Sequence, residues 1–234
     1  MTVEPNDPTR AGSPVAAASN GVVLSLSEIQ ALCMKAARGA GLPWGLAEEA
    51  GMAGAWLAAA GLPGPDLILQ LLQEPAHEPP AVAPGRWRPA ASGALCPLTA
   101  GTALSDFAGL AEGLDGGALT IQGLFLPLLL VPFAAGIARR LNRTVGIAWP
   151  GFTALLGPAG YRLSADARNA AVVQRADATV TWADEKASMT PLGRTGRAVP
   201  HDVWEELDRL AMRTTVPATA RSHADAGAAG SDNE

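Results

Sequence analysis

The side chains in this 234-residue chain that could do acid–base or nucleophilic chemistry are few and lie far apart. Glu48 and Glu49 are neighbours on a predicted helix, so they point about 100° apart around its axis and cannot share a proton or hold one metal ion unaided. We favour a first-turn pair that the helix dipole stabilises. The alternative is that one of the two carboxylates is a base or a ligand beside Trp44.

The two cysteines have no neighbours that would make them metal ligands or nucleophiles. A structural zinc site needs about four Cys or His ligands in pairs, so we expect no metal site, and the sequence predicts no cofactor. Cys33 falls in an apolar helical stripe, which indicates a packed core thiol. Cys96 would need a base to form a thiolate, and the three histidines are predicted in a linker, at a helix start and in a tail (His77, His201 and His223). A buried, structural Cys96 is the favoured interpretation.

The composition excludes two broad classes of protein. Hydrophobic residues make up 48% of the chain and charged residues 17%, which is too apolar and too weakly charged for a disordered chain. The net charge is −5, and the dense basic stretch (Arg139, Arg140 and Arg143) is typical of a solvent-exposed helix end. Among the tryptophans, only Trp87 has a basic residue on either side, so we expect no nucleic-acid partner.

One uncharged segment, Gly116–Ala138, has the length of a membrane span, which needs about twenty apolar residues. Pro127 and Pro132 interrupt it, so we favour a buried strand near Ala118–Gln122 followed by a core helix from Pro127 to Leu141. A membrane location is therefore not expected. The first residues do not resemble a secretory signal, and the expected compartment is the cytoplasm, with both thiols reduced.

Helical patterns occupy the N-terminal part of the chain, over residues 23–73. Ser25 and Glu28 have the spacing of a capping box, which predicts a helix that begins directly after Ser25. Asp66 is the predicted cap of a short later helix. The first of these helices is predicted to stop at Gly39 or Gly41, and the other two segments with helical spacing of apolar residues are 43–60 and 67–73.

The rest of the chain is predicted to hold an α+β domain over residues 94–215. Residues 74–93 are rich in proline, which predicts an extended linker without a helix or a central strand. Turn signals between the strands predict an antiparallel meander of about four strands with the core helix on one face. The predicted strands are 118–122, 145–149, 152–156, 161–163 and 178–182, and the predicted helices are 102–111, 127–141 and one capped by Asp202.

These elements together predict an α+β fold, in which a unit of about three helices packs on the meander, its core helix and a C-terminal helix. Residues 1–22 are predicted to be a disordered leader and residues 216–234 a disordered tail, because both are rich in small and polar residues.

Three short motifs resemble those of an uncharacterised bacterial family, domain of unknown function 3726. Residues 36–51 (AARGAGLPWGLAEEAG) resemble its N-terminal signature, residues 96–101 (CPLTAG) its middle motif, and residues 213–219 (RTTVPAT) its C-terminal motif. This chain departs from the family pattern at Ala220, in place of Glu, and at His223, in place of Arg. No role is carried over to these two positions, and the resemblance implies no known activity, substrate or cofactor.

The motifs suggest a binding site if they converge on a cleft between the helical unit and the sheet domain. Arg213 would then hold a ligand carboxylate in bidentate fashion, or it would form a salt bridge with Glu48 or Glu49 that joins the two halves. The candidate binding residues are Trp44, Glu48, Glu49, Cys96, Thr99, Arg213 and Thr214. No catalytic residue is assigned.

Two classes of function remain open on these observations. We favour an accessory or partner-binding protein that acts beside a metabolic enzyme, because the sequence contains no recognised catalytic triad, metal set or nucleotide-binding loop. The alternative is a small-molecule enzyme or binder that uses the cleft between the helical unit and the sheet domain. The expected partners are therefore a second protein or a small-molecule ligand.

Overall fold

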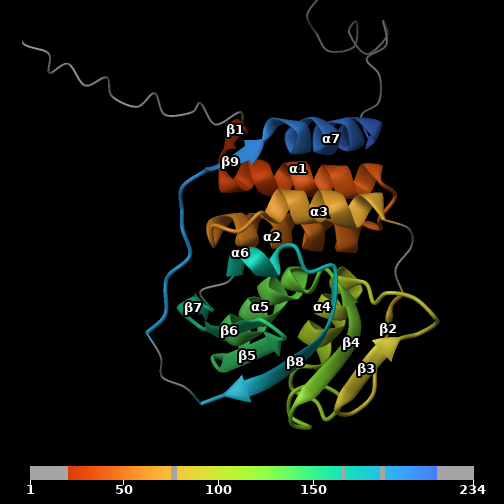
Figure 1. Cartoon of the computed structure of the whole chain (residues 1–234), viewed down its shortest axis with the longest axis vertical. Coiled ribbons are helices and arrows are strands. Elements are labelled where there is room, and N and C mark those ends of the chain that lie inside the picture. Colours follow the sequence, from red (N-terminus) through yellow and green to blue (C-terminus); the bar gives the residue numbers. More distant parts are fainter. Residues whose placement is uncertain (1–20, 75–77, 165–166, 185–187, 215–234) are drawn as a thin grey trace, which may run out of the picture.

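The computed structural model describes residues 21–74, 78–164, 167–184 and 188–214, and they form two layers, with helices stacked above a sheet (Figure 1). The fold is α+β, as predicted. His77, nearly all of the predicted leader and the whole predicted tail lie outside the described residues. The domain boundaries drawn above stay a prediction.

The helical layer contains the three predicted N-terminal helices and one from the far end of the chain. Its helices are α1 (Leu26–Gly39), α2 (Trp44–Ala59), α3 (Gly64–Gln73) and α7 (His201–Ala211). The strands β1 (Gly21–Leu24) and β9 (Arg197–Pro200) form a small antiparallel sheet that precedes α1 and α7. The C-terminal helix therefore packs on α1 and not on the large sheet (Figure 1).

The helix starts agree with the predictions at one position and differ at three. The capping box of α1 is present, because Glu28 N–H donates to Ser25 Oγ at 3.2 Å and Ser25 N–H donates to Glu28 Oε2 at 2.8 Å. The predicted caps Asp66 and Asp202 are wrong, since α3 and α7 begin earlier, each directly after a proline. The helix α4 (Pro97–Phe107) also begins before the predicted Thr102, because Pro97 fits the first helical position.

The large sheet is mixed, with the strand order β2-β3-β4-β8-β5-β6-β7 within the described residues. Its strands are β2 (Pro80–Ala81), β3 (Arg86–Pro89), β4 (Leu119–Phe125), β5 (Thr144–Trp149), β6 (Phe152–Gly157), β7 (Gly160–Leu163) and β8 (Arg175–Ala183). The predicted meander is correct for β5, β6 and β7, which are consecutive and antiparallel. After the short helix α6 (Ala167–Ala170), the chain returns, and β8 pairs between β4 and β5 at the centre of the sheet.

The proline-rich segment is not only a linker, and this part of the prediction is wrong. Residues 80–89 supply β2 and β3, and β3 pairs in parallel with β4. Proline is tolerated there because Pro80 and Pro89 face each other at the strand ends. Trp87 of β3 is fully buried, and its indole N–H donates to the carbonyl oxygen of Glu112 at 2.9 Å.

The uncharged segment forms a buried strand and part of a core helix, as predicted, but the α-helix begins at Val131 and not at Pro127. The segment holds β4, a 3₁₀ turn η1 (Pro127–Leu130) and most of the 11-residue helix α5 (Val131–Leu141), whose last residues lie beyond it. Both prolines stand in the first turn of their helical element, where no backbone N–H is lost to the ladder. No helix in the described ranges combines the length and the apolar content that crossing a membrane requires.

The contact between α1 and α7 depends on one glycine. A Cβ atom built on Gly39 would lie 1.7 Å from the carbonyl oxygen of Leu210, which is backbone and cannot rotate away. The two helix ends can therefore approach each other only because residue 39 has no side chain.

We expect Gly39→Ala to lower the free energy of unfolding by about 2 kcal/mol, because α7 must move away from α1 to admit the methyl group. Urea unfolding followed by circular dichroism measures this. Gly45→Ala is the matched control, since a Cβ atom at Gly45 of α2 meets nothing within 4 Å. Equal stability of the two variants would contradict the close approach.

Candidate functional site

A cleft of about 530 Å³ lies between the two layers. We call it the layer cleft. Its walls come from α1 and α2 of the helical layer, from α5 above the sheet, from the turn between β6 and β7, and from residues 192–193. A cleft between the helical unit and the sheet domain was one of the sequence predictions.

Two helices face the layer cleft with the same spacing of residues. The lining residues are Met52, Ala55, Trp56 and Ala59 on α2, and Pro132, Ala135, Gly136 and Arg139 on α5. Both sets follow the pattern i, i+3, i+4, i+7, which places their members along one helix face. Small residues on each face leave the space that the cleft occupies.

An aromatic pair forms one wall of the cleft. The rings of Trp56 and Tyr161 are tilted by 59° with centroids 5.5 Å apart. The hydroxyl of Tyr161 donates to the carbonyl oxygen of Ala60 at 3.4 Å, and its backbone exchanges two hydrogen bonds with Thr190. Tyr161 therefore joins the edge of the sheet to the end of α2 and has a fixed position.

Among the described residues that line the cleft, Arg139 is the one with a charged side chain. The other two arginines of the basic stretch have partners elsewhere. Arg140 donates to the carbonyl oxygen of Ser105. Arg143 Nη1 lies 3.2 Å from Asp115 Oδ1, and Arg143 Cζ lies 3.7 Å from the ring centre of Trp182. Arg139 has no hydrogen-bond or ion-pair partner in the part of the chain that the structure describes. Its guanidinium is free to bind a ligand.

The predicted residues Trp44, Arg213 and Thr214 lie at one end of the helical layer. Trp44 is 63% exposed, and the guanidinium of Arg38 lies 4.6 Å from its ring centre. The 3₁₀ turn η2 (Met212–Thr214) contacts α1. The predicted salt bridge from Arg213 to Glu48 or Glu49 is not formed among the described residues. The Thr214 hydroxyl donates to the carbonyl oxygen of Ala211 at 2.8 Å.

The predicted residues Cys96 and Thr99 lie at the start of α4. Cys96 N–H donates to the carbonyl oxygen of Glu78 at 2.9 Å, and the Thr99 hydroxyl donates to the carbonyl oxygen of Cys96 at 3.3 Å. None of the seven predicted residues lines the layer cleft.

Glu49 is the predicted residue with a perturbed charge. Burial raises the pKa of the Glu49 carboxyl group above its ordinary value of 4.5, and the nearby carboxylates Glu48 and Asp106 raise it further. Glu48 itself is exposed. No set of three or more His, Cys, Asp or Glu in the described ranges has the arrangement of a metal site.

Cys33 is the packed core thiol that its position in the helical stripe predicted. It is fully buried, and burial, together with the charge of Asp66, raises its pKa to about 12. The thiol is therefore protonated at neutral pH and unsuited to nucleophilic attack. Cys96 is only half-buried, so the prediction of a buried cysteine is too strong for this position.

A part of the first half of the chain matches a known protein family. Residues 24–112 match the family described as Protein of unknown function (DUF3726). The match confirms the resemblance for the portion with the first two motifs. No curated protein matches the chain. The DUF3726 match includes α1 and α2, and so one wall of the layer cleft, whereas α5 and the β6–β7 turn lie beyond it.

We expect Glu49→Gln to stabilise the protein at neutral pH. The folded state holds the Glu49 proton more tightly than the unfolded chain, so ionisation of this group above its ordinary pKa of 4.5 disfavours folding. The gain in the free energy of unfolding should be present at pH 7 and disappear as the pH falls below about 4.5.

Urea unfolding at pH 7 and pH 4 measures the effect of this substitution. Glu74→Gln, at the exposed end of α3, is the matched control that removes the same charge outside this acidic group. An equal gain from Glu49→Gln at both pH values would contradict the assignment.

Proposed function

We propose that this protein binds a small, largely apolar molecule in the layer cleft. The cleft volume of about 530 Å³ carries this proposal, because ligand sites typically measure about 300–1,000 Å³ and are lined mainly by apolar and aromatic side chains. Most of the described lining residues are apolar, and the polar side chains among them are Ser27, Gln30, Arg139 and the hydroxyl of Tyr161.

The walls of the cleft are held in place by segments that are far apart in sequence. Arg197 donates from Nε to the carbonyl oxygen of Ala58 at 2.9 Å, and Gly193 N–H donates to that of Ala59 at 3.1 Å. Tyr161 binds the next carbonyl, that of Ala60. A site with walls fixed before binding loses little conformational entropy when the ligand enters, which supports a binding role.

The side chains around the cleft are of the kinds that hold a ligand. They include the aromatic rings of Trp56 and Tyr161, the guanidinium of Arg139, and the amide and hydroxyl of Gln30 and Ser27. This composition favours a ligand-binding accessory protein that acts beside the enzyme which makes or consumes the ligand. An enzyme that uses the same cleft is the alternative proposal.

Ala55→Phe tests the location of the proposed site, because Ala55 lies in the α2 stripe and a phenyl group there would occupy part of the cleft. A fragment library is screened against the wild-type protein by ligand-observed NMR. We expect the variant to weaken binding of the hits by more than about tenfold, equivalent to 1.4 kcal/mol.

Ala118→Phe is the matched control, since Ala118 is exposed next to β4 and does not line the cleft. It should bind the same fragments as the wild type. Retention of binding in Ala55→Phe, or the absence of any hit with the wild type, would refute a ligand site in the layer cleft.

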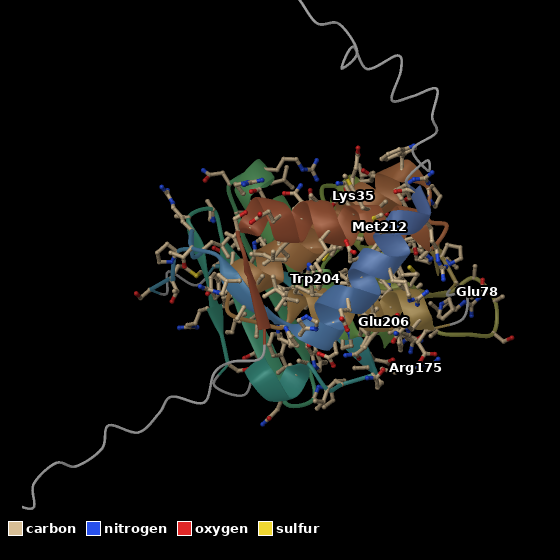
Figure 2. All side chains as sticks on the ribbon, turned by 90° about the horizontal axis from the view of Figure 1, so that it is seen from above. Lys35, Glu78, Arg175, Trp204, Glu206 and Met212 are labelled. Atoms are coloured by element: carbon tan, nitrogen blue, oxygen red, sulfur yellow. The ribbon has the colours of Figure 1, made fainter. Side chains whose placement is uncertain are left out.

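A partner protein is the second candidate function, and one surface favours it. A groove of about 280 Å³ between α1 and α7 is lined by Leu32, Trp204 and Met212, the last of which is 57% exposed. Figure 2 shows Trp204 and Met212 along α7. The charged residues that line this α1–α7 groove are two acidic ones, Glu28 and Asp208, and one basic one, Lys35, among the residues that the structure describes. Hydrogen bonds from Ser25 lower the pKa of Glu28, so this side chain stays charged at neutral pH.

The occupant that fits this surface is an amphipathic helix of the partner, with an apolar stripe on the groove and basic residues opposite Glu28 and Asp208. Such a helix would lie beside α1 and α7 as a further member of the helical layer. This form of the accessory role needs no ligand in the layer cleft.

Met212→Glu should abolish capture of such a partner when tagged protein is purified from its native host, because it places a negative charge where the apolar stripe of the partner helix would pack. Val172→Glu is the control: Val172 is 74% exposed and lies outside the groove. A partner that survives Met212→Glu, or no partner with the wild-type protein, would refute the groove as its docking site.

A further inference from the structure

We infer that the ligand of the layer cleft is a monocarboxylate with an aromatic or branched apolar body. The inference rests on the proposed binding role of the cleft and adds the chemical class of the molecule. Two observations support it: Arg139 lines the cleft, and so does the Trp56–Tyr161 ring pair.

Arg139, which is exposed at the rim of the cleft, is the one positive charge among the described lining residues, and it favours an anion. Arg139 has no partner among the described residues, while its neighbours Arg140 and Arg143 are both engaged elsewhere. The guanidinium group presents donors in a planar fork that matches a carboxylate in bidentate fashion. The attraction is local, because the chain as a whole has a net charge of −5.

The charge balance favours a carboxylate over a phosphate group. A carboxylate has one negative charge, which Arg139 neutralises, whereas a phosphate monoester has about 1.5 to 2 at neutral pH. The other polar side chains at the cleft, Ser27 and Gln30, are neutral. A dianion would keep an unbalanced charge beside apolar walls, which costs free energy.

The positions of the lining residues set the orientation of the ligand. Arg139 and Pro132 lie at opposite ends of the α5 stripe, seven residues or about 10 Å apart along the helix. The carboxylate end therefore binds at the Arg139 end, and the apolar body extends along α5. The tilted rings of Trp56 and Tyr161 offer flat surfaces on which an aromatic body packs.

The test uses the full chain and four probes that share one aromatic body: 3-phenylpropionate, its methyl ester, 3-phenylpropylamine and 3-phenylpropyl phosphate. Dissociation constants are measured by NMR titration for the wild type and Arg139→Gln. Arg88→Gln is the control, since Arg88 is exposed on β3, near the other edge of the sheet from the cleft. Thermal unfolding checks that each variant is folded.

We expect the wild type to bind 3-phenylpropionate at least tenfold more tightly than the ester, the amine or the phosphate. Arg139→Gln should weaken binding of the acid by at least tenfold and change that of the ester by less than twofold. Arg139→Lys should recover part of the affinity for the acid, because it restores the charge without the planar fork. Arg88→Gln should bind all four probes as the wild type does.

Any other outcome contradicts the inference, and the pattern of binding shows whether the ligand class or the binding site itself is wrong. Equal binding of acid and ester, both lost in Ala55→Phe, would leave the layer cleft as a binding site but remove the carboxylate. Tighter binding of the phosphate would replace the carboxylate by a dianion. Acid binding that survives both Arg139→Gln and Ala55→Phe would overturn the proposed function as well. Failure of all four probes, with fragment hits still lost in Ala55→Phe, would refute only the ligand class.

Discussion

The packing of α2 between two different neighbours is the constraint on which the rest of the structure depends. One face of α2 presses on α1 so closely that a Cβ atom at Gly54 would lie 2.9 Å from the sulfur of Cys33. The opposite face, with Ala55 and Trp56, looks toward α5 and the β6–β7 turn across the layer cleft. Because the first contact fixes the position and rotation of α2, it also fixes which residues the cleft presents.

The local elements were readable from the sequence because their signals are local. The capping box of Ser25 and Glu28 marks the start of α1, and turn residues between β5, β6 and β7 predict three strands that pair with their neighbours in sequence. The position of β8 was not readable, since it pairs with β4 and β5 across a long stretch of chain. Nothing in a local pattern distinguishes a strand at the edge of a sheet from one at its centre.

For the candidate site, too, the local spacing of residues could be predicted from the sequence but the tertiary arrangement could not. The spacing from Met52 to Ala59 and from Pro132 to Arg139 is present in the sequence, but an apolar stripe at helical spacing normally marks the core. Which stripe is left open depends on the tertiary arrangement of both helices. The residues proposed from motifs, such as Cys96 and Arg213, were chosen for their chemical type, and they lie on other parts of the molecule.

The last carbonyl groups of α2 and the one that follows it limit the fraying of the C-terminal end of this helix. A helix end usually frays, because its last carbonyls have no partner within the helix. Here the oxygens of Ala58, Ala59 and Ala60 accept hydrogen bonds from Arg197, Gly193 and Tyr161, which come from two other segments of the chain, residues 193–197 and strand β7. Separating this end from the body of the molecule would break all three at once. Amide hydrogens in the last turn of α2 should therefore exchange with solvent as slowly as those in the middle of the helix.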